Sequence, residues 1–433
     1  MRIFFFAATI VAFASPASAG QTASKALTLD ACIRLAEDAQ SNVSAARQQS
    51  EIARYGLIQA RAGFLPQIHF GNGYTYNSAL QGGPEVFSFI ALNGIREYNS
   101  MFTTALEVDT SGKLRAALAR ARADQDAAAA NVGIVRRDLK RAVTAAYYRL
   151  LLTRRLIRVA QDALLEAQSF ERRARLLFEN GEVAQGDVIK AAAQVAFLQQ
   201  ISNNAQLDAQ IANHDLASFW TPDVAEDLSI VDDLDQPVTP PEPASVSVER
   251  AAGAAAPFSS RPEFKLLDAE KRGLMADARC SRAELFPQAN VVFQYGIDSL
   301  RLRIGDRGYA AFVSVGIPLF DWMRIRSQAR QFDLRAQQIE AGRAIAERTF
   351  SRAYQDALAR VRHVYQQISL AESQVKLSDE NLRLSRLRFD GGEGLALDVV
   401  AAQNQLAQAR TNYYTALVNY LSARADLEVA VGR

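Results

Sequence analysis

Apolar residues recur every three or four positions over long stretches of this chain, the spacing of one face of an α-helix. In one stretch the recurring positions are Val132, Val135, Leu139, Val143, Ala146, Leu150, Ile157, Ala160 and Leu164. In a later stretch they are Leu358, Val361, Tyr365, Ile368, Ala371 and Val375. Good helix formers fill most positions between them. The pattern predicts two long helices, over about 112–180 and 323–390.

Shorter helices are predicted over about 29–65, 185–220, 263–286 and 395–430. A helix over 112–180 would be about 100 Å long, and the helices over 29–65 and 185–220 about 55 Å each. Two half-length helices placed end to end would therefore match one full-length helix. An antiparallel coiled coil alone would explain this packing, but it would leave the segments between the helices unexplained.

Four of those segments alternate between apolar and polar or small residues, which predicts strands over about 67–77, 100–109, 288–298 and 310–319. After Pro66 one face carries Ile68, Phe70, Tyr74 and Tyr76. The other face carries Gln67, His69, Gly71, Gly73 and Thr75. Such alternation with aromatic residues is typical of a barrel wall between lipid and a wet interior. A soluble β-hairpin cap is the alternative.

Four strands are too few to enclose a water-filled pore. Backbone groups in a bilayer must satisfy their hydrogen bonds, which excludes an open sheet there, and single-chain barrels begin at about eight strands. Subunits would have to pool their strands, and three chains would supply twelve.

The chain is an internal repeat. Pro66 and Pro287 stand in matching helix-to-strand junctions, "RAGFLPQ" and "RAELFPQ". "RLLFENGEVAQGDV" returns as "RLRFDGGEGLALDV", 211 positions later. The units are predicted at 20–220 and 263–433. Residues 221–262 join them as a linker that holds seven of the twelve prolines, a density that stops helices.

The first residues, "MRIFFFAATIVAFASPASAG", read as a secretory signal peptide. Arg2 precedes a short apolar run, and Ala17-Ser18-Ala19 forms a cleavage site, so residues 1–19 are excluded from the fold. A membrane anchor is the alternative, but the run is too short to span. No cysteine follows the small residues, so lipidation is not expected.

Charge and chemistry narrow the function. A net charge of +2 from 49 basic and 47 acidic residues gives no case for nucleic acid. Cys32 and Cys280 have no framework spacing and are expected to be unpaired thiols. The three histidines have no metal-ligand spacing. No catalytic or phosphate-binding motif is present. Neither an enzyme nor a bound cofactor or metal is expected.

The order of these features resembles the TolC family of outer-membrane efflux and secretion proteins. The resemblance rests on "LTLDACIRLAEDAQSNVSAAR", the two "RA-x-x-x-PQ" junctions, "GIPLFDWMR" and the two glycine turns. It implies a mainly α protein with a transmembrane β-barrel: a homotrimer in which a twelve-stranded barrel in outer-membrane lipid continues as a long periplasmic helical barrel. Its implied role is the exit duct of a tripartite pump or type I secretion system. Its partners would be a periplasmic adaptor and an inner-membrane transporter of RND or ABC type.

The resemblance also assigns the turns a role. They would form the periplasmic tips of two helical hairpins and contact the adaptor through Asn180, Gly181, Gly391, Gly392 and Gly394. The gate residues it implies at the tunnel entrance are Asp187, Asp398, Phe178 and Phe389. A simpler hypothesis for the two aspartates is that they cap the returning helices.

This chain departs from the family pattern at three gate positions. Ala401 stands where a second acidic residue is expected, Phe389 where a tyrosine is, and Gly394 where an arginine is. We therefore expect a weaker or differently built closure.

Two other functions fit an exported helical protein. One is a periplasmic adaptor with helical hairpins, although an adaptor usually has one hairpin flanked by β-rich halves. The other is a structural coiled-coil protein of the envelope. Four methionines and three histidines give no support to a dedicated soft-metal route.

Overall fold

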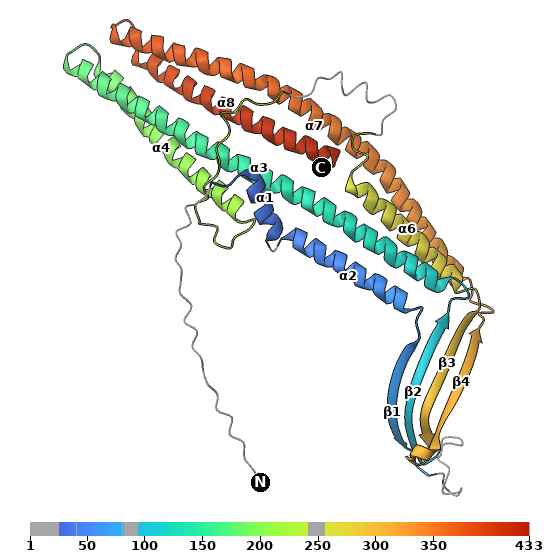
Figure 1. Cartoon of the computed structure of the whole chain (residues 1–433). Helices are drawn as coiled ribbons and strands as arrows, with labels where there is room; N and C mark the ends of the chain where they lie inside the picture. The colour runs from blue at the N-terminus through green and yellow to red at the C-terminus, as the bar shows by residue number, and fades with distance from the viewer. Residues whose placement is uncertain (1–25, 40, 80, 82–93, 241–255, 433) are drawn as a thin grey trace, which may run out of the picture.

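The structure is a computed structural model that describes residues 26–39, 41–79, 81, 94–240 and 256–432. The molecule is elongated, with a four-stranded sheet at one end and two helical hairpin tips at the other (Figure 1). The signal peptide predicted at residues 1–19 lies outside the described residues.

Each half of the chain contributes helices, two strands, a long helix and a returning helix. The first half consists of α1 (Leu29–Asp38), α2 (Asn42–Ala62), β1 (Gln67–Tyr76), β2 (Arg96–Val108), α3 (Lys113–Glu179) and α4 (Gln185–Ala217). The second half consists of α6 (Pro262–Ala283), β3 (Gln288–Ser299), a short 3₁₀ turn η1 (Ile304–Asp306), β4 (Arg307–Gly316), α7 (Arg324–Asp390) and α8 (Ala396–Val431). This order confirms the predicted fold class of two tandem units.

The repeat holds at the level of hydrogen-bond register. Helices α3 and α7 both contain 67 residues, and their first residues are 211 positions apart. In the sheet, Gln67 lies opposite Ala105, and Gln288 lies opposite Gly316. Those two pairs are related by the same offsets of 221 and 211 that relate the two halves of the sequence.

The structure corrects the first predicted helix. The helix expected over 29–65 is two helices, because Ala39 has extended backbone and Ser41 is the N-cap of a new helix that begins at Asn42. The Ser41 amide donates to Ser44 Oγ at 3.1 Å, which caps the new start.

The returning strands also begin earlier than expected, at Arg96 rather than 100 and at Arg307 rather than 310. In the first of them, Glu97 and Asn99 lie on the polar face of the sheet, so their polarity does not end the strand.

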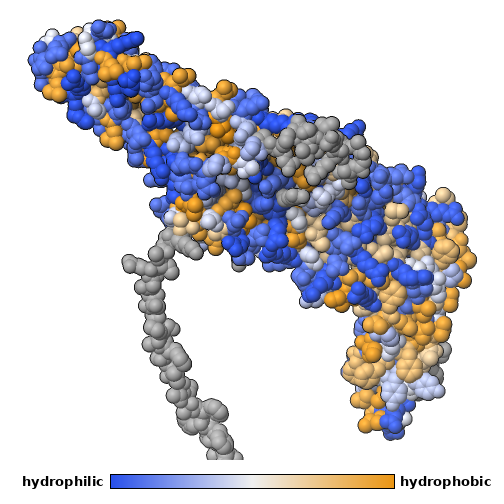
Figure 2. Space-filling model, turned by 45° about the horizontal axis from the view of Figure 1, so that its top comes forward, coloured by the Kyte–Doolittle hydropathy of each residue, from blue (hydrophilic) through white to orange (hydrophobic). Residues whose placement is uncertain are grey.

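The four strands form one antiparallel sheet in the order β1-β2-β3-β4. The register places aromatic and branched residues on one face, among them Ile68, Phe70, Tyr74, Tyr98, Phe102, Phe293, Tyr295, Tyr309 and Val313. Many of these side chains are exposed, Ile68 to 69% and Val313 to 74%, and apolar surface covers this end of the molecule (Figure 2). Within the described residues, β1 and β4 pair along one side only.

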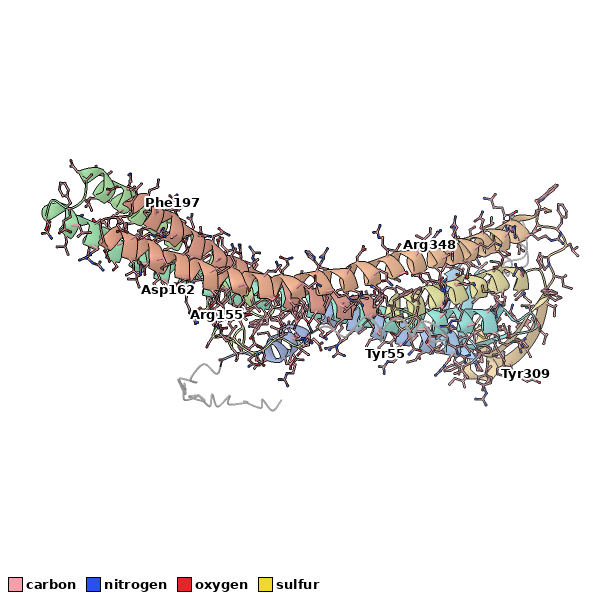
Figure 3. The ribbon with its side chains drawn as sticks, turned by 90° about the horizontal axis from the view of Figure 1, so that it is seen from above. Tyr55, Arg155, Asp162, Phe197, Tyr309 and Arg348 are labelled. Atoms are coloured by element: carbon pink, nitrogen blue, oxygen red, sulfur yellow. The ribbon has the colours of Figure 1, made fainter. Side chains whose placement is uncertain are left out.

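The helices repeat the lateral order of the strands. Helices α2 and α4 pack on one side of α3, α6 and α8 pack on its other side, and α7 packs beyond α6 and α8. One lateral edge of the layer therefore carries α2 and α4, and the other carries α7. Tyr55 and Arg348 lie toward these opposite edges (Figure 3). Within the part of the chain that the structure describes, no helix is both long and apolar enough to cross a membrane.

The central core lies where α1, α3, α4 and α8 meet. Its largest buried side chains include Tyr147, Leu150, Leu151 and Leu216, and the segment after α4 adds Leu228, Ile230 and Leu234. Arginine 155 ties that segment to α3: its guanidinium lies 2.6 Å from both Asp232 and Asp235, and it stacks on the Tyr414 ring at 5.4 Å. Burial lowers the pKa of Arg155, but the hydrogen bonds to the two carboxylates outweigh burial and raise it overall.

Replacing Arg155 with alanine should destabilise the protein by about 2 kcal/mol, because two carboxylates lose a charged hydrogen-bond donor. Thermal unfolding and limited proteolysis of segment 221–240 would measure the loss. Arg158→Ala is the matched control, since Arg158 is exposed and lies 3.5 Å from Asp232. Equal effects of the two changes would contradict the anchoring role.

The same turn closes both hairpins. In the first, Gly181 has φ +78°, its amide donates to Phe178 O at 2.9 Å, and the Glu182 amide donates to Leu177 O at 2.8 Å. Gly392 (φ +76°) and Glu393 make the equivalent bonds to the carbonyls of Phe389 and Arg388, at 3.1 and 2.9 Å. Both turns are Schellman motifs, in which a left-handed residue ends the helix and satisfies its last carbonyls.

Gly392→Ala should cost about 1 kcal/mol, because a side chain at positive φ collides with its own backbone. Gly391→Ala should be neutral, since Gly391 has φ −81° and helical backbone. Thermal unfolding in detergent, together with protease cleavage at the tip, compares the two variants. A destabilising Gly391→Ala beside a neutral Gly392→Ala would contradict the assignment of the turn.

Candidate functional site

The ends of the two hairpins nearest their tips, in α3–α4 and α7–α8, meet around a shared apolar cluster. Its buried members are Phe170, Ala174, Leu177, Ala191, Leu382, Phe389, Ala396, Val399, Ala402 and Leu406. The rings of Phe170 and Phe389 meet edge to face at 4.9 Å between centroids. Phe389, predicted at the entrance, is thus buried between the hairpins, whereas its repeat equivalent Phe178 is 41% exposed. The absence of a phenolic hydroxyl suits this apolar position.

Asp187 and Asp398 both lie in the first turn of a returning helix. Asp398 accepts a hydrogen bond from the Leu395 amide at 3.4 Å, and Asp187 pairs with Lys190 at 3.2 Å on its own helix. The Asp398 contact caps the start of α8, whereas Asp187 bonds only a side chain and no backbone amide, so the capping hypothesis fits Asp398 alone. Neither aspartate is paired with the other hairpin in the described part of the chain.

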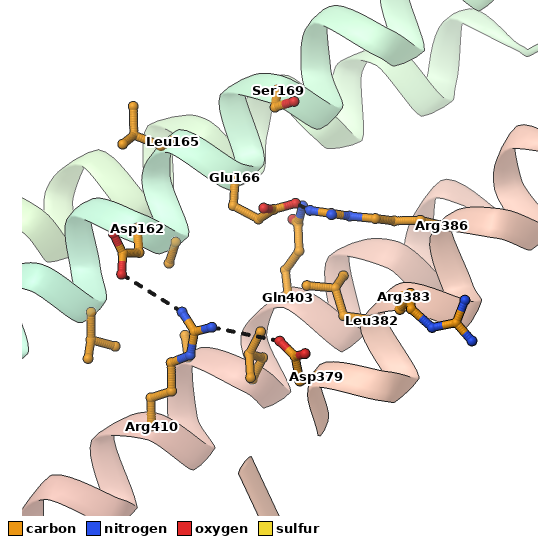
Figure 4. A pocket seen from close by; sticks show the side chains of 14 residues that line it. Asp162, Leu165, Glu166, Ser169, Asp379, Leu382, Arg383, Arg386, Gln403 and Arg410 are labelled. Atoms are coloured by element: carbon orange, nitrogen blue, oxygen red, sulfur yellow. Dashed lines mark ion pairs between the residues drawn. The ribbon is translucent and has the colours of Figure 1, made fainter. Parts of the chain in front are cut away.

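A cleft of about 500 Å³ lies between the hairpins, a few helical turns from the tips in the direction of the sheet (Figure 4). Helices α3, α7 and α8 supply its walls. Charged side chains from all three line it: Asp162, Glu166, Asp379, Arg383, Arg386 and Arg410.

Ion pairs across this cleft join the hairpins. Arg410 on α8 lies 3.9 Å from Asp162 on α3 and 3.7 Å from Asp379 on α7. Arg386 on α7 pairs with Glu166 on α3. We call the two pairs that join α3 to the second hairpin the inter-hairpin latch; its members are Asp162, Glu166, Arg386 and Arg410. Because Asp162 and Glu166 are four residues apart, they share one face of α3.

Further polar contacts surround the latch. Burial lowers the pKa of the Arg386 guanidinium, and the nearby Asp390 carboxylate opposes this shift in part. Arg173 pairs with Asp390 at 3.1 Å, and Gln194 donates to Asn404 Oδ1 at 2.6 Å. The hairpins are therefore held by charged and amide pairs beside the apolar cluster, whose Leu382 and Leu406 line the same cleft. Sequence analysis missed the latch, although carboxylates four apart on α3 are a visible signal for arginine partners such as Arg386 and Arg410.

The two helix-to-strand junctions share one set of hydrogen bonds, made by the glutamine that follows each proline in the repeated sequence. Gln67, after Pro66, donates from Nε2 to the carbonyls of Ala62 and Leu65 at 2.9 and 3.1 Å. Gln288, after Pro287, makes the equivalent bonds to Ala283 and Phe286, at 2.9 and 2.8 Å. Each glutamine satisfies carbonyls that the helix end leaves free.

The described residues contain no group of three or more His, Cys, Asp or Glu poised to hold a metal. Cys32 is a free thiol in the central core, and burial raises its pKa to about 11. Cys280 is a second free thiol, half-buried on α6.

Comparison with known proteins agrees with this architecture. The cobalt-zinc-cadmium resistance protein CzcC of Cupriavidus metallidurans is 23% identical over 413 residues, which cover 94% of this chain and 90% of that protein. The pyoverdine export outer membrane protein OpmQ of Pseudomonas putida is 22% identical, with coverage of 93% and 85%.

Solved structures share the fold. The outer membrane protein VceC of Vibrio cholerae superposes with a TM-score of 0.79 at 18% identity, covering 93% of this chain and 96% of that one. The CmeC outer membrane channel of Campylobacter jejuni gives 0.82 at 15% identity, with coverage of 93% and 85%. The sequence profile of the outer membrane efflux protein family matches residues 32–220 and 259–433, one match for each repeat. The chain therefore belongs to the outer membrane efflux protein family and is an efflux channel of the outer membrane.

Proposed function

We propose that three copies of this chain form one continuous duct, a twelve-stranded barrel in outer-membrane lipid that extends as a helical tunnel across the periplasm. The observation that carries the proposal is the shared lateral order of strands and helices, with one free edge on each side. An apolar, aromatic face and a polar face on the same strands suit a wall between lipid and water. Closing the ring would pair β4 of each copy with β1 of the next.

The duct conducts and performs no chemistry. Cargo would enter at the hairpin tips from a periplasmic adaptor, with the energy supplied by an inner-membrane transporter. The Schellman turns, with Asn180 and Gly391 at the helix ends, would present the adaptor-contact surface. Relatives named for metal resistance and for pyoverdine export both match this chain over most of their length, which supports selection of cargo by the pump.

The entrance has two states, closed and dilated, and the inter-hairpin latch biases the closed one. Dilation requires the two hairpins to move relative to each other, which separates the pairs across the cleft. Asp187 and Asp398 would line the closed entrance from three subunits, and a ring of Asp398 would attract cations. With Ala401 and Gly394 at neighbouring gate positions, the latch and the apolar cluster carry most of the closure.

Membrane fractionation tests the proposed assembly. The protein should partition with the outer membrane and run as a detergent-resistant trimer that dissociates on heating. An adaptor would follow the inner membrane or the soluble fraction, and an envelope coiled-coil protein would not give heat-modifiable trimers. A monomer that stays in solution without detergent would overturn the proposal.

The combination Asp162→Asn and Glu166→Gln should raise single-channel conductance in a planar bilayer severalfold, because both latch arginines lose their partners on α3. Glu171→Gln is the matched control: it removes a carboxylate from the same helix, but Glu171 pairs with Arg175 on α3 itself. Unchanged conductance in the latch variant would show that the closure lies elsewhere. Small wild-type currents with strong cation block would instead favour an acidic double ring.

A further inference from the structure

Helix α7 exposes apolar residues whose repeat equivalents on α3 are buried. Leu370 is 62% exposed, whereas Val159, 211 positions earlier, is 6% exposed. Leu334 is 46% exposed and its equivalent Ala123 only 3%. The cause lies in the layer of helices: α3 has neighbours on both sides, and α7 has neighbours on one side only.

The internal repeat specifies what would cover the free side of α7. A shift of 211 positions carries α3 onto α7, and the reverse shift carries α8 onto α4. The seam between α3 and α8 inside the chain therefore has a counterpart between α7 of one copy and α4 of the next.

One ion pair of the internal seam keeps both partners under this shift. Arg141 Nε on α3 lies 2.7 Å from Asp426 Oδ1 on α8, and the equivalent positions hold Arg352 and Asp215. The other α3–α8 pairs do not survive: Lys140–Glu428 becomes Ser351 and Ala217, and Asp162–Arg410 becomes Ser373 and Gln199.

Within one chain Arg352 and Asp215 have only exposed contacts. Arg352 is 80% exposed and lies 3.9 Å from Asp356 on its own helix. Asp215 is 47% exposed and lies 3.1 Å from Arg149, which is 61% exposed. Exposed pairs of this kind contribute little to stability, so both side chains are available to a partner.

We propose that Arg352 of one copy binds Asp215 of the next, in a seam between α7 and α4 that repeats the internal seam between α3 and α8. The inference rests on the proposed trimer and specifies its interface. Leu370 would pack in the same seam, as Val159 does inside the chain.

The repeat also fixes the register between strands of neighbouring copies, through its offset of 211 from β2 to β4 and of 221 from β1 to β3. Phe102 on β2 lies opposite Tyr295 on β3. The equivalent positions place Val313 on β4 opposite Tyr74 on β1 of the next copy. Both side chains lie on the apolar face of their strand, whereas a one-residue slip would bring opposite faces together.

Paired cysteines test the seam in the full-length protein in its membrane. The combination Arg352→Cys with Asp215→Cys should give covalent dimers and trimers on a non-reducing gel after mild oxidation, and a reductant should return them to monomers. Val313→Cys with Tyr74→Cys should do the same. The matched control, Arg141→Cys with Asp426→Cys, should crosslink only within one chain and run as a monomer.

The outcomes separate this inference from the assembly on which it rests. If both inter-copy pairs stay uncrosslinked in a protein that remains a heat-modifiable trimer, the seam is wrong and the duct stands. If the unmodified protein is a monomer in mild detergent, the duct and the seam fail together. Each single-cysteine variant must stay monomeric on the gel, because crosslinks there would come from Cys32 or Cys280.

Discussion

Unsatisfied backbone hydrogen bonds at the two edges of one sheet govern the whole design. Strand β1 and strand β4 each leave a row of amides and carbonyls without a partner in the described chain, a cost that lipid would make severe. One face of the sheet is apolar and aromatic and suits contact with lipid, where no water is present to bond the free edges. Because the helices follow the strands in the same lateral order, one solution closes both parts of the molecule: another copy beside each edge.

Periodicity and internal repetition were enough to predict the fold class. The 3–4 spacing around Leu150 and Val361 marks positions that are buried or partly buried in both long helices, and period-two alternation marks strands whose faces the register separates. The break at Ala39 was missed because apolar spacing continues across it. Strand ends were missed because polar residues on a wet face look like the start of a loop.

The candidate site was less accessible to sequence analysis, for a physical reason. Turn chemistry is local, so Gly181 and Gly392 could be assigned from neighbouring residues alone. The latch depends on partners such as Glu166 and Arg386, which are more than 200 positions apart, and only packing of the hairpins brings them together. The burial of Phe389 likewise depends on a distant residue, Phe170 from the other hairpin, so the local sequence could not predict it.

The duplication has a consequence for how such a duct can change. Two units per chain make three chains quasi-equivalent to a ring of six hairpins, in which every second member derives from the same half of the gene. A substitution in one half therefore alters alternate hairpins and leaves those between them intact. Divergence such as Asn180 against Gly391, at matched places in one backbone motif, lets selection adjust the docking and the sealing of a single ring independently.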